Sequence, residues 1–187
     1  MEPPRDKVFE DLAIELKEGK ICPVLLGSAE KGNGILRLMK ALRHEAPTIT
    51  ETLKRLGASP GKPSAQVIKS MHTAHGGKIS LARVLSGELG DGMVVHGPSG
   101  EERIAGVFTL RGQEAAKRGP AKAGETVGLG RLERIKAGET ISTEKSGVAQ
   151  LAVLQPPPPV YAFAVAVKDK KDEVKLTAAI TKIIDED

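Results

Sequence analysis

The stretch GKISLARVLSGELGDGMVV, residues 77–95, decides the fold of the middle of this chain. Its short apolar runs are separated by turn residues, at Gly87 and at Asp91-Gly92. Short apolar runs at regular spacing are typical of antiparallel strands in a small closed barrel or sandwich. The same texture continues along the chain, and AGET occurs at 123–126 and again at 137–140, which indicates two similar turn-to-strand segments. We therefore predict a β domain over residues 65–146.

The residues before this domain show helical spacing and one strand-like run. Apolar residues recur at helical spacing over residues 6–18, where Gly19 ends the helix, and again over residues 31–45. Between these helices, residues 21–26 form a short, continuously apolar run that is typical of a buried parallel strand. Helix, strand and helix in this order favour the last part of a doubly wound α/β domain over residues 1–57.

A capping box and a linker follow this α/β part. Thr48 and Glu51 have the spacing of a capping box, which predicts a short helix that runs to Leu56 and ends at Gly57. Residues 58–64 end in SPGKPS, a composition that predicts a linker.

The residues after the β domain predict the beginning of a further domain. Residues 147–159 end in QPPPP, which reads as a stiff extended linker because proline cannot join the interior of a sheet. VYAFAVAV, residues 160–167, alternates bulky and small side chains as a strand does. A helix follows from Asp172 and Glu173, with its apolar stripe at Leu176, Ile180, Ile183 and Ile184. One strand and one helix cannot cover each other's apolar faces, so we expect a truncated domain over residues 160–187.

Composition limits the kinds of core and partner. The chain has 187 residues, of which 40% are hydrophobic and only 2% aromatic, so we expect an aliphatic core and little stacking of bases on aromatic rings. The net charge of +4 is compatible with RNA or another anionic surface. The single cysteine, Cys22, excludes an internal disulfide. The sequence shows no signal peptide and no apolar run that could span a membrane, so we expect a cytoplasmic protein without a membrane partner.

The order of these parts resembles bacterial elongation factor G or a close paralogue. PVLLGSA, residues 23–29, followed by the helix over 32–42, is similar to the end of the family's GTP-binding domain. Residues 65–145, above all 77–95 and AGETVGLGRLERIKAGETIS at 123–142, resemble its second domain. Residues 156–187 resemble the opening of its third domain. The resemblance implies an α+β, mainly β chain. Its translation-factor β-barrel is flanked by the C-terminal α/β remnant of a P-loop GTPase domain and by the first β-α unit of a ferredoxin-like domain.

The resemblance also implies a function for the full-length protein. It would be a ribosome-dependent GTPase that promotes movement of tRNA and mRNA, with the barrel contacting the ribosome and coupling the domains. Its partners would be ribosomal RNA and proteins, and it would bind GTP or GDP with Mg²⁺. Two alternatives stay open: a stand-alone β-barrel interaction module without GTPase activity, and a ribosomal-protection or recycling paralogue.

The resemblance places Gly27, Ser28 and Ala29 in the loop that contacts the guanine base in the full-length protein. The alternative is a plain strand-to-helix turn. The chain has neither a Gly-x-x-x-x-Gly-Lys-Ser/Thr phosphate loop nor an Asn-Lys-x-Asp motif. Phosphate binding needs the backbone N–H groups of such a loop. We therefore expect these 187 residues to contain no catalytic residue, to hold no cofactor by themselves, and neither to bind GTP tightly nor to hydrolyse it.

Basic side chains in the β domain are candidates for RNA contact, because lysine and arginine neutralise phosphate and release counterions. The alternative is an ordinary solvated face. The candidates are Lys78, Arg83, Arg111, Lys117, Arg118, Lys122 and Arg131. The histidines carry no metal signal: His72 and His75 lack a third ligand or a cysteine cluster nearby, so we expect no metal site. We predict turn or surface positions for His44, His72, His75 and His96.

Overall fold

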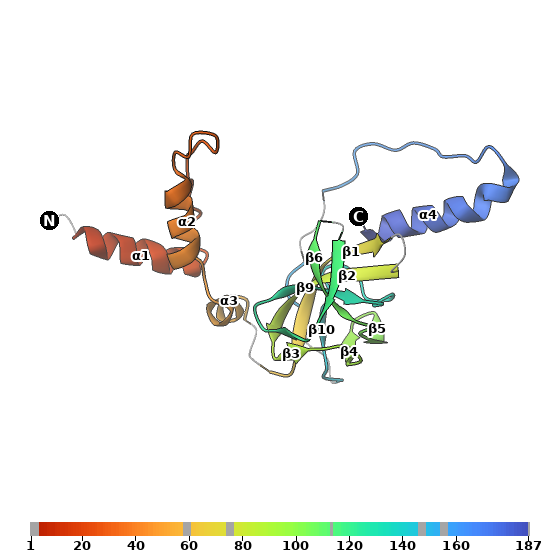
Figure 1. Cartoon of the computed structure of the whole chain (residues 1–187), viewed down its shortest axis with the longest axis horizontal. Helices are drawn as coiled ribbons and strands as arrows, with labels where there is room; N and C mark the ends of the chain where they lie inside the picture. The colour runs from red at the N-terminus through yellow and green to blue at the C-terminus, as the bar shows by residue number, and fades with distance from the viewer. Residues whose placement is uncertain are drawn as a thin grey trace. The chain divides into compact units, whose positions relative to one another are not determined.

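The computed structural model describes residues 4–57, 61–73, 77–112, 114–145, 149–153 and 157–186. The chain divides into two compact units, Met1–Pro60 and Gly61–Asp187 (Figure 1). Parts of both predicted linkers, residues 58–60, 147–148 and 154–156, lie outside the described residues.

The described residues of the first unit contain three helices, α1 (Arg5–Lys17), α2 (Ile35–His44) and α3 (Ile49–Arg55). Each corresponds to a helix that the sequence predicts. The capping box is confirmed, because Thr48 Oγ1 accepts from the Glu51 N–H at 3.3 Å and Glu51 Oε2 accepts from the Thr48 N–H at 2.7 Å. Lys17 Nζ lies 3.2 Å from Glu51 Oε1, which ties the end of α1 to the start of α3.

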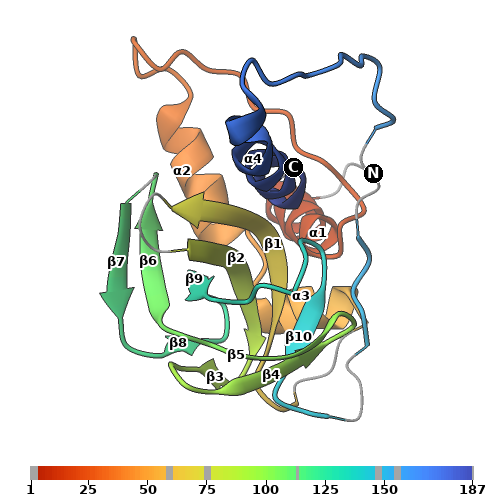
Figure 2. The same cartoon turned by 90° about the vertical axis from the view of Figure 1, so that its right-hand side faces the viewer.

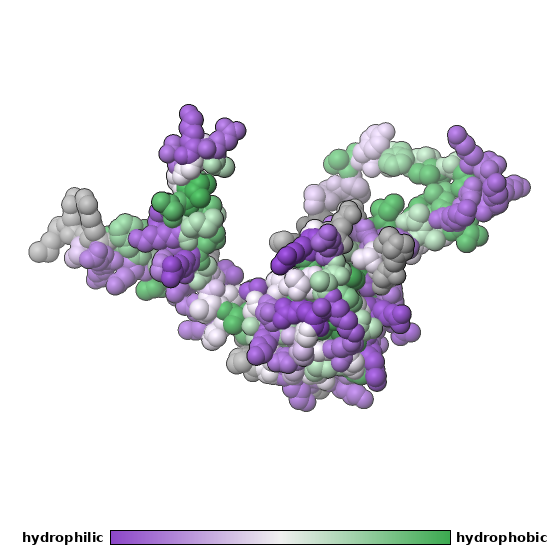
Figure 3. All heavy atoms as spheres, in the orientation of Figure 1, coloured by the Kyte–Doolittle hydropathy of each residue, from purple (hydrophilic) through white to green (hydrophobic). Residues whose placement is uncertain are grey.

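The predicted buried strand over residues 21–26 is wrong. These residues form no strand, and the side chains of Val24 and Leu26 are 84% and 89% exposed. A buried parallel strand needs hydrogen-bonding neighbours on both sides. The described residues of this unit contain no other strand, so the apolar run has nothing to pair with. The apolar side chains of α2 also lie at the surface, at Leu36, Leu38, Met39 and Leu42 (Figure 3).

The second unit is built around a large antiparallel sheet, which confirms the mainly β prediction. The strands are β1 (Ser64–Thr73), β2 (Gly77–Ser86), β3 (Glu88–Leu89), β4 (Val94–Gly97), β5 (Gly100–Arg103), β6 (Val107–Arg111), β7 (Glu114–Arg118), β8 (Ala121–Lys122), β9 (Thr126–Gly130) and β10 (Thr140–Ser142). Eight of them pair in the order β5-β4-β10-β1-β2-β9-β6-β7, and β3 pairs with β8. The hydrogen-bonded ladder begins at β5 and ends at β7, and Figure 2 shows the sheet curving around its core. We call residues 61–145 the sheet domain.

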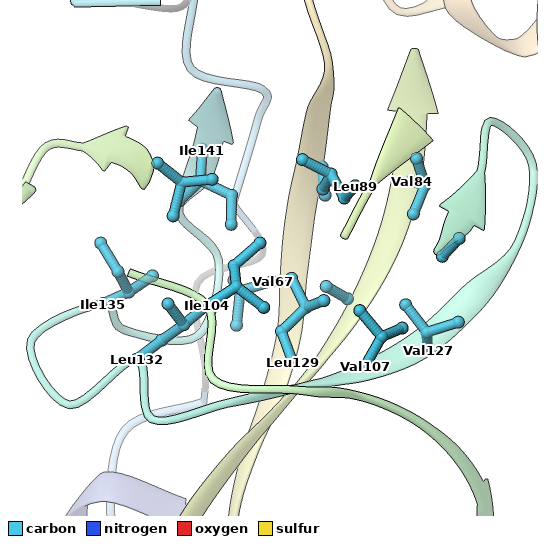
Figure 4. Close-up of a cluster of buried hydrophobic side chains, with 14 residues drawn as sticks. Val67, Val84, Leu89, Ile104, Val107, Val127, Leu129, Leu132, Ile135 and Ile141 are labelled. Carbon is cyan, nitrogen blue, oxygen red and sulfur yellow. The ribbon is translucent and has the colours of Figure 1, made fainter. Parts of the chain in front are cut away.

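The core of the sheet domain is aliphatic, as its composition predicts. Figure 4 shows side chains from most strands and from the loop after β9 converging on one cluster. Its members are Ala65, Val67, Ala82, Val84, Leu89, Val95, Ile104, Val107, Ala121, Val127, Leu129, Leu132, Ile135 and Ile141. Alternation on β2 puts Ala82 and Val84 inside and the exposed Arg83 outside.

A register shift on β1 extends the inward face with polar residues. The pairing of β1 with β2 shifts between Val67 and Lys69, after which Ser70 lies opposite Ser80 and His72 opposite Lys78. Such a bulge inserts an extra residue and thereby resets which side chains face inward. Beyond Val67, therefore, the inward positions of β1 and β2 are polar, while Leu129 of β9, opposite Ser80, still belongs to the aliphatic core.

Helix α4 (Glu173–Glu186) follows the sheet domain and is preceded by a 3-10 turn, η1 (Lys170–Asp172). The helix is confirmed, but the predicted strand over residues 160–167 is wrong. These residues form no strand, and Val160, Tyr161, Phe163 and Val165 are exposed (Figure 3). No strand in the described part of this unit pairs with them. Figures 1 and 2 both show the C-terminal end of α4 beside β1.

Candidate functional site

The loop over residues 27–34 is closed by its own backbone. The Ser28 N–H donates to the Asn33 carbonyl at 2.9 Å, and the Gly32 N–H donates to the Ala29 carbonyl at 3.3 Å. Helix α2 begins directly after Gly34, which has a left-handed φ of 77°. A Cβ at Gly27 would lie 2.7 Å from the Asn33 carbonyl oxygen. In this structure, the glycine therefore permits close approach of the loop's own backbone.

The backbone N–H of Ala29 is the group in this loop that could donate a hydrogen bond to a ligand. It donates to no acceptor within the described part of the chain, while the Ser28 N–H beside it is used to close the loop. Ser28 is half-buried and Ala29 is exposed. An exposed backbone donor in a loop before a helix suits a carbonyl or anionic oxygen of a ligand.

Lys78 does not belong with the RNA-contact candidates. It is 1% exposed, and its Nζ donates to the Ile135 carbonyl at 2.8 Å, to the Glu133 carbonyl at 3.2 Å and to Asp185 Oδ1 at 2.8 Å. Its place on β2 explains this burial, because Lys78 is an even number of residues from Ala82 and Val84 and so shares their inward face. Strand alternation was the signal that could have revealed it from the sequence.

His72 also differs from its predicted position, because it lies on a strand with a largely buried side chain. It lies on β1 with its side chain 16% exposed, between Asp185 and Glu186 of α4. The prediction of a turn or surface position is therefore wrong for His72. His96 lies on β4, 3.4 Å from a carboxylate oxygen of Glu101, and His75 lies outside the described residues.

Four of the basic candidates are exposed and make no ion pair with a carboxylate in the described residues: Arg83, Arg111, Lys122 and Arg131. Arg83 and Lys122 come from adjoining backbone segments, because the Gly124 N–H donates to the Val84 carbonyl at 2.8 Å. Arg111 ends β6, and Arg131 follows β9 at the opposite end of the β2–β9 ladder from Arg83. We call Arg83 and Lys122 the cationic patch.

Two other candidates are held by acidic neighbours. Lys117 Nζ lies 2.9 Å from Asp91 Oδ2, and Arg118 contacts both carboxylate oxygens of Glu125, at 2.9 and 3.2 Å. The Lys122 backbone N–H, followed by Arg118, holds the pKa of Glu125 below its ordinary value. Lys117 and the Gly106 N–H do the same for the pKa of Asp91. Both carboxylates are thus stabilised in the charged form and neutralise part of the basic surface.

Comparison with known proteins identifies the class of the sheet domain. Residues 62–144 match the family model described as "Elongation factor G domain 2". A crystal structure of a protein from Thermus thermophilus has the same fold, with a TM-score of 0.78 and 23% identity, over 100% of this chain and 28% of that one.

The relatives extend this match along the whole chain. It is 38% identical to an elongation factor G-like protein of Synechocystis sp., covering 100% of this chain and 27% of the relative. It is 30% identical to elongation factor G of Petrotoga mobilis and 27% identical to that of Jannaschia sp., covering 29% and 26% of those proteins. These matches confirm the resemblance of the chain to elongation factor G, and the chain spans about a quarter of the length of these relatives.

Neither a membrane span nor a metal cluster is found among the described residues. No helix there is long and apolar enough to cross a membrane. No group of three or more His, Cys, Asp or Glu side chains in the same part of the chain is arranged to hold a metal ion.

Proposed function

We propose that these residues belong to an elongation factor G-like, ribosome-dependent GTPase that promotes the movement of tRNA and mRNA in the cytoplasm. In this proposal the sheet domain contacts the ribosome and couples the domains around it. The observation that carries the proposal is the match of residues 62–144 to the family's second domain within an alignment over the whole chain. GTP or GDP with Mg²⁺ would be bound by the complete protein, with Gly27, Ser28 and Ala29 beside the base.

Unpartnered apolar surface supports the proposed domain organisation. The segments at 21–26 and 160–167, and apolar residues of α2 and α4, are exposed on either side of the sheet domain in the sequence. Apolar patches of this kind mark surfaces that a larger assembly covers. We propose that residues 1–57 end a GTP-binding α/β domain, that residues 65–146 form a closed barrel between linkers at 58–64 and 147–159, and that residues 160–187 begin a ferredoxin-like domain.

For RNA contact we propose the cationic patch, together with Arg111 and Arg131. These side chains are exposed and form no ion pair with a carboxylate in the described residues, whereas Lys117 and Arg118 are partly neutralised and Lys78 is inside the fold. Each basic side chain that meets a phosphate releases counterions, so that binding weakens steeply with salt and does not depend on base sequence.

The test is binding of the purified chain to small ribosomal subunits by sedimentation over a series of salt concentrations. Arg83→Gln combined with Lys122→Gln should weaken binding by about tenfold and reduce the slope of log affinity against log salt by roughly 1.4 to 1.8. The control, Lys170→Gln with Lys171→Gln, removes the same charge from the exposed η1 turn and should change neither. Equal losses in both double variants would refute the cationic patch. Absence of binding at low salt would favour the stand-alone module.

We propose further that the isolated chain does not bind GTP tightly, because the phosphate loop is missing from its sequence. Titration with a fluorescent GDP or GTP analogue tests this proposal. A micromolar dissociation constant would refute it.

A second candidate within the family has one observation in its favour. Identity is 38% to the relative named elongation factor G-like protein, against 30% and 27% to the two named elongation factor G. This difference favours an elongation factor G-like paralogue, such as a recycling or ribosomal-protection factor, over the main translocase. Complementation of translocation in a purified translation system by the complete protein separates these two candidates.

A further inference from the structure

One end of the sheet domain presents an unusual inward face. Beyond the register shift on β1, the inward positions of β1 and β2 are Ser70, Ser80, His72 and Lys78, whereas the hydrophobic core cluster is aliphatic. Ser70 Oγ and Ser80 Oγ are buried and have no hydrogen-bond partner in the described part of the chain. We call Lys78 together with the adjacent His72 the cationic mouth, after the ammonium group of Lys78. A fully buried ammonium such as that of Lys78 is costly unless a carboxylate and further acceptors surround it.

The last turn of α4 supplies those carboxylates from more than a hundred residues away in the sequence. Asp185 Oδ1 lies 2.8 Å from Lys78 Nζ, and Asp185 Oδ2 lies 3.6 Å from His72 Nε2. Glu186 Oε1 accepts from the backbone N–H of His72 at 2.5 Å and lies 3.1 Å from its Nδ1. Both acidic side chains therefore engage the cationic mouth, and two carbonyls, of Glu133 and Ile135, complete the surroundings of the ammonium.

Apart from its last turn, α4 makes little packing contact with the rest of this unit. Its described residues are exposed or half-buried, including Val174, Ile183 and Ile184, and no residue of the helix is buried. A helix of this length is only marginally stable in water by itself. Contact through its last turn is therefore the main support for both the position and the helicity of α4 in this unit.

We propose that the cationic mouth is a docking site for the acidic last turn of α4, occupied within the same molecule, and that this contact is a releasable latch between the sheet domain and the segment carrying α4. Docking of α4 gives the buried Lys78 ammonium its counter-charge, the carboxylate of Asp185. When α4 is released, another anion or water must take the place of that carboxylate. The latch would be one physical contact through which the sheet domain couples to its neighbours, so its functional role depends on the proposed function above. The experiment that tests the latch uses neither ribosome nor nucleotide. The latch and the proposed function can therefore be refuted independently of each other.

The test is hydrogen–deuterium exchange of the full chain, read in peptides from α4 and, separately, from β1 and β2. Asp185→Asn combined with Glu186→Gln keeps side-chain size while removing both charges. Exchange in α4 should become about tenfold faster or more, while β1 and β2 stay protected. The control, Asp169→Asn, removes a charge that pairs with Lys171 at 3.6 Å ahead of η1 and should leave α4 unchanged.

A second variant changes the basic partner of the latch, on β2, instead of the acidic residues of α4. Lys78→Met replaces the ammonium by an apolar side chain of similar length, which a sheet interior tolerates. Strands β1 and β2 should keep their protection while α4 exchanges as fast as in the acidic double variant. Unchanged exchange in α4 in either variant, with the sheet folded, would overturn the proposal. So would an effect that appears only at high chain concentration, because the contact would then join two copies.

Discussion

Gly130 is a position in the sheet domain where one added methyl group should be strongly destabilising. It ends β9, and its backbone exchanges hydrogen bonds with the segment that enters β6: the Ala105 N–H donates to its carbonyl at 3.0 Å, and its own N–H donates to the Gly106 carbonyl at 3.0 Å. A Cβ at Gly130 would overlap the Ala105 carbonyl oxygen and lie 3.1 Å from Phe108 Cε2. The obstacle is backbone, so a side-chain rotation cannot relieve the clash.

The expected cost of Gly130→Ala follows from these contacts. Moving the Ala105 carbonyl away strains or breaks the two flanking hydrogen bonds, each of which contributes about 1 kcal/mol. Overpacking against Phe108 adds about 1 kcal/mol or more. The reduced freedom of the unfolded chain offsets roughly 0.5 kcal/mol of this loss. We therefore expect the free energy of unfolding of the sheet domain to fall by about 2.5 kcal/mol.

The assay must report on the sheet domain alone, since the chain has two compact units. Urea-dependent hydrogen exchange of the β2 amides does so. Gly119→Ala is the matched control, because a Cβ there meets nothing within 4 Å. The reasoning is refuted if Gly130→Ala and Gly119→Ala differ by less than about 0.5 kcal/mol, a difference typical of surface substitutions.

Two further outcomes are expected. Thr48→Ala removes the acceptor for the Glu51 N–H and should destabilise α3 by about 1 kcal/mol, read as faster amide exchange in α3 with no change in α4. The folded state holds the pKa of Glu125 below its ordinary value of 4.5, so its contacts with the Lys122 backbone N–H and with Arg118 stabilise the sheet domain above that pH. This contribution is lost as the pH falls through the lowered pKa. Glu125→Gln should therefore reduce the loss of stability between about pH 6 and pH 3, measured by urea unfolding. An equal loss in both proteins would contradict the assignment.

The local sequence determined those elements whose signals lie in neighbouring residues. The spacing of Thr48 and Glu51 predicted α3 and its capping box, because capping joins residues three apart. Apolar periodicity likewise predicted α1 and α4, and the short apolar runs with their glycine turns predicted the antiparallel strands. The motifs of residues 77–95 and 123–142 were enough to indicate the family.

Only the tertiary structure decided which distant residues meet. Residues 21–26 and 160–167 have strand-like sequences but form no strand, because a strand exists only beside a partner. The sequence alone placed Lys78 among surface cations, whereas alternation and the carboxylate of Asp185, more than a hundred residues further on, hold it inside. Strand alternation records which face Lys78 shares, but the carboxylate that makes burial of its charge possible is close only in space and remote in sequence, so no local pattern records that partner.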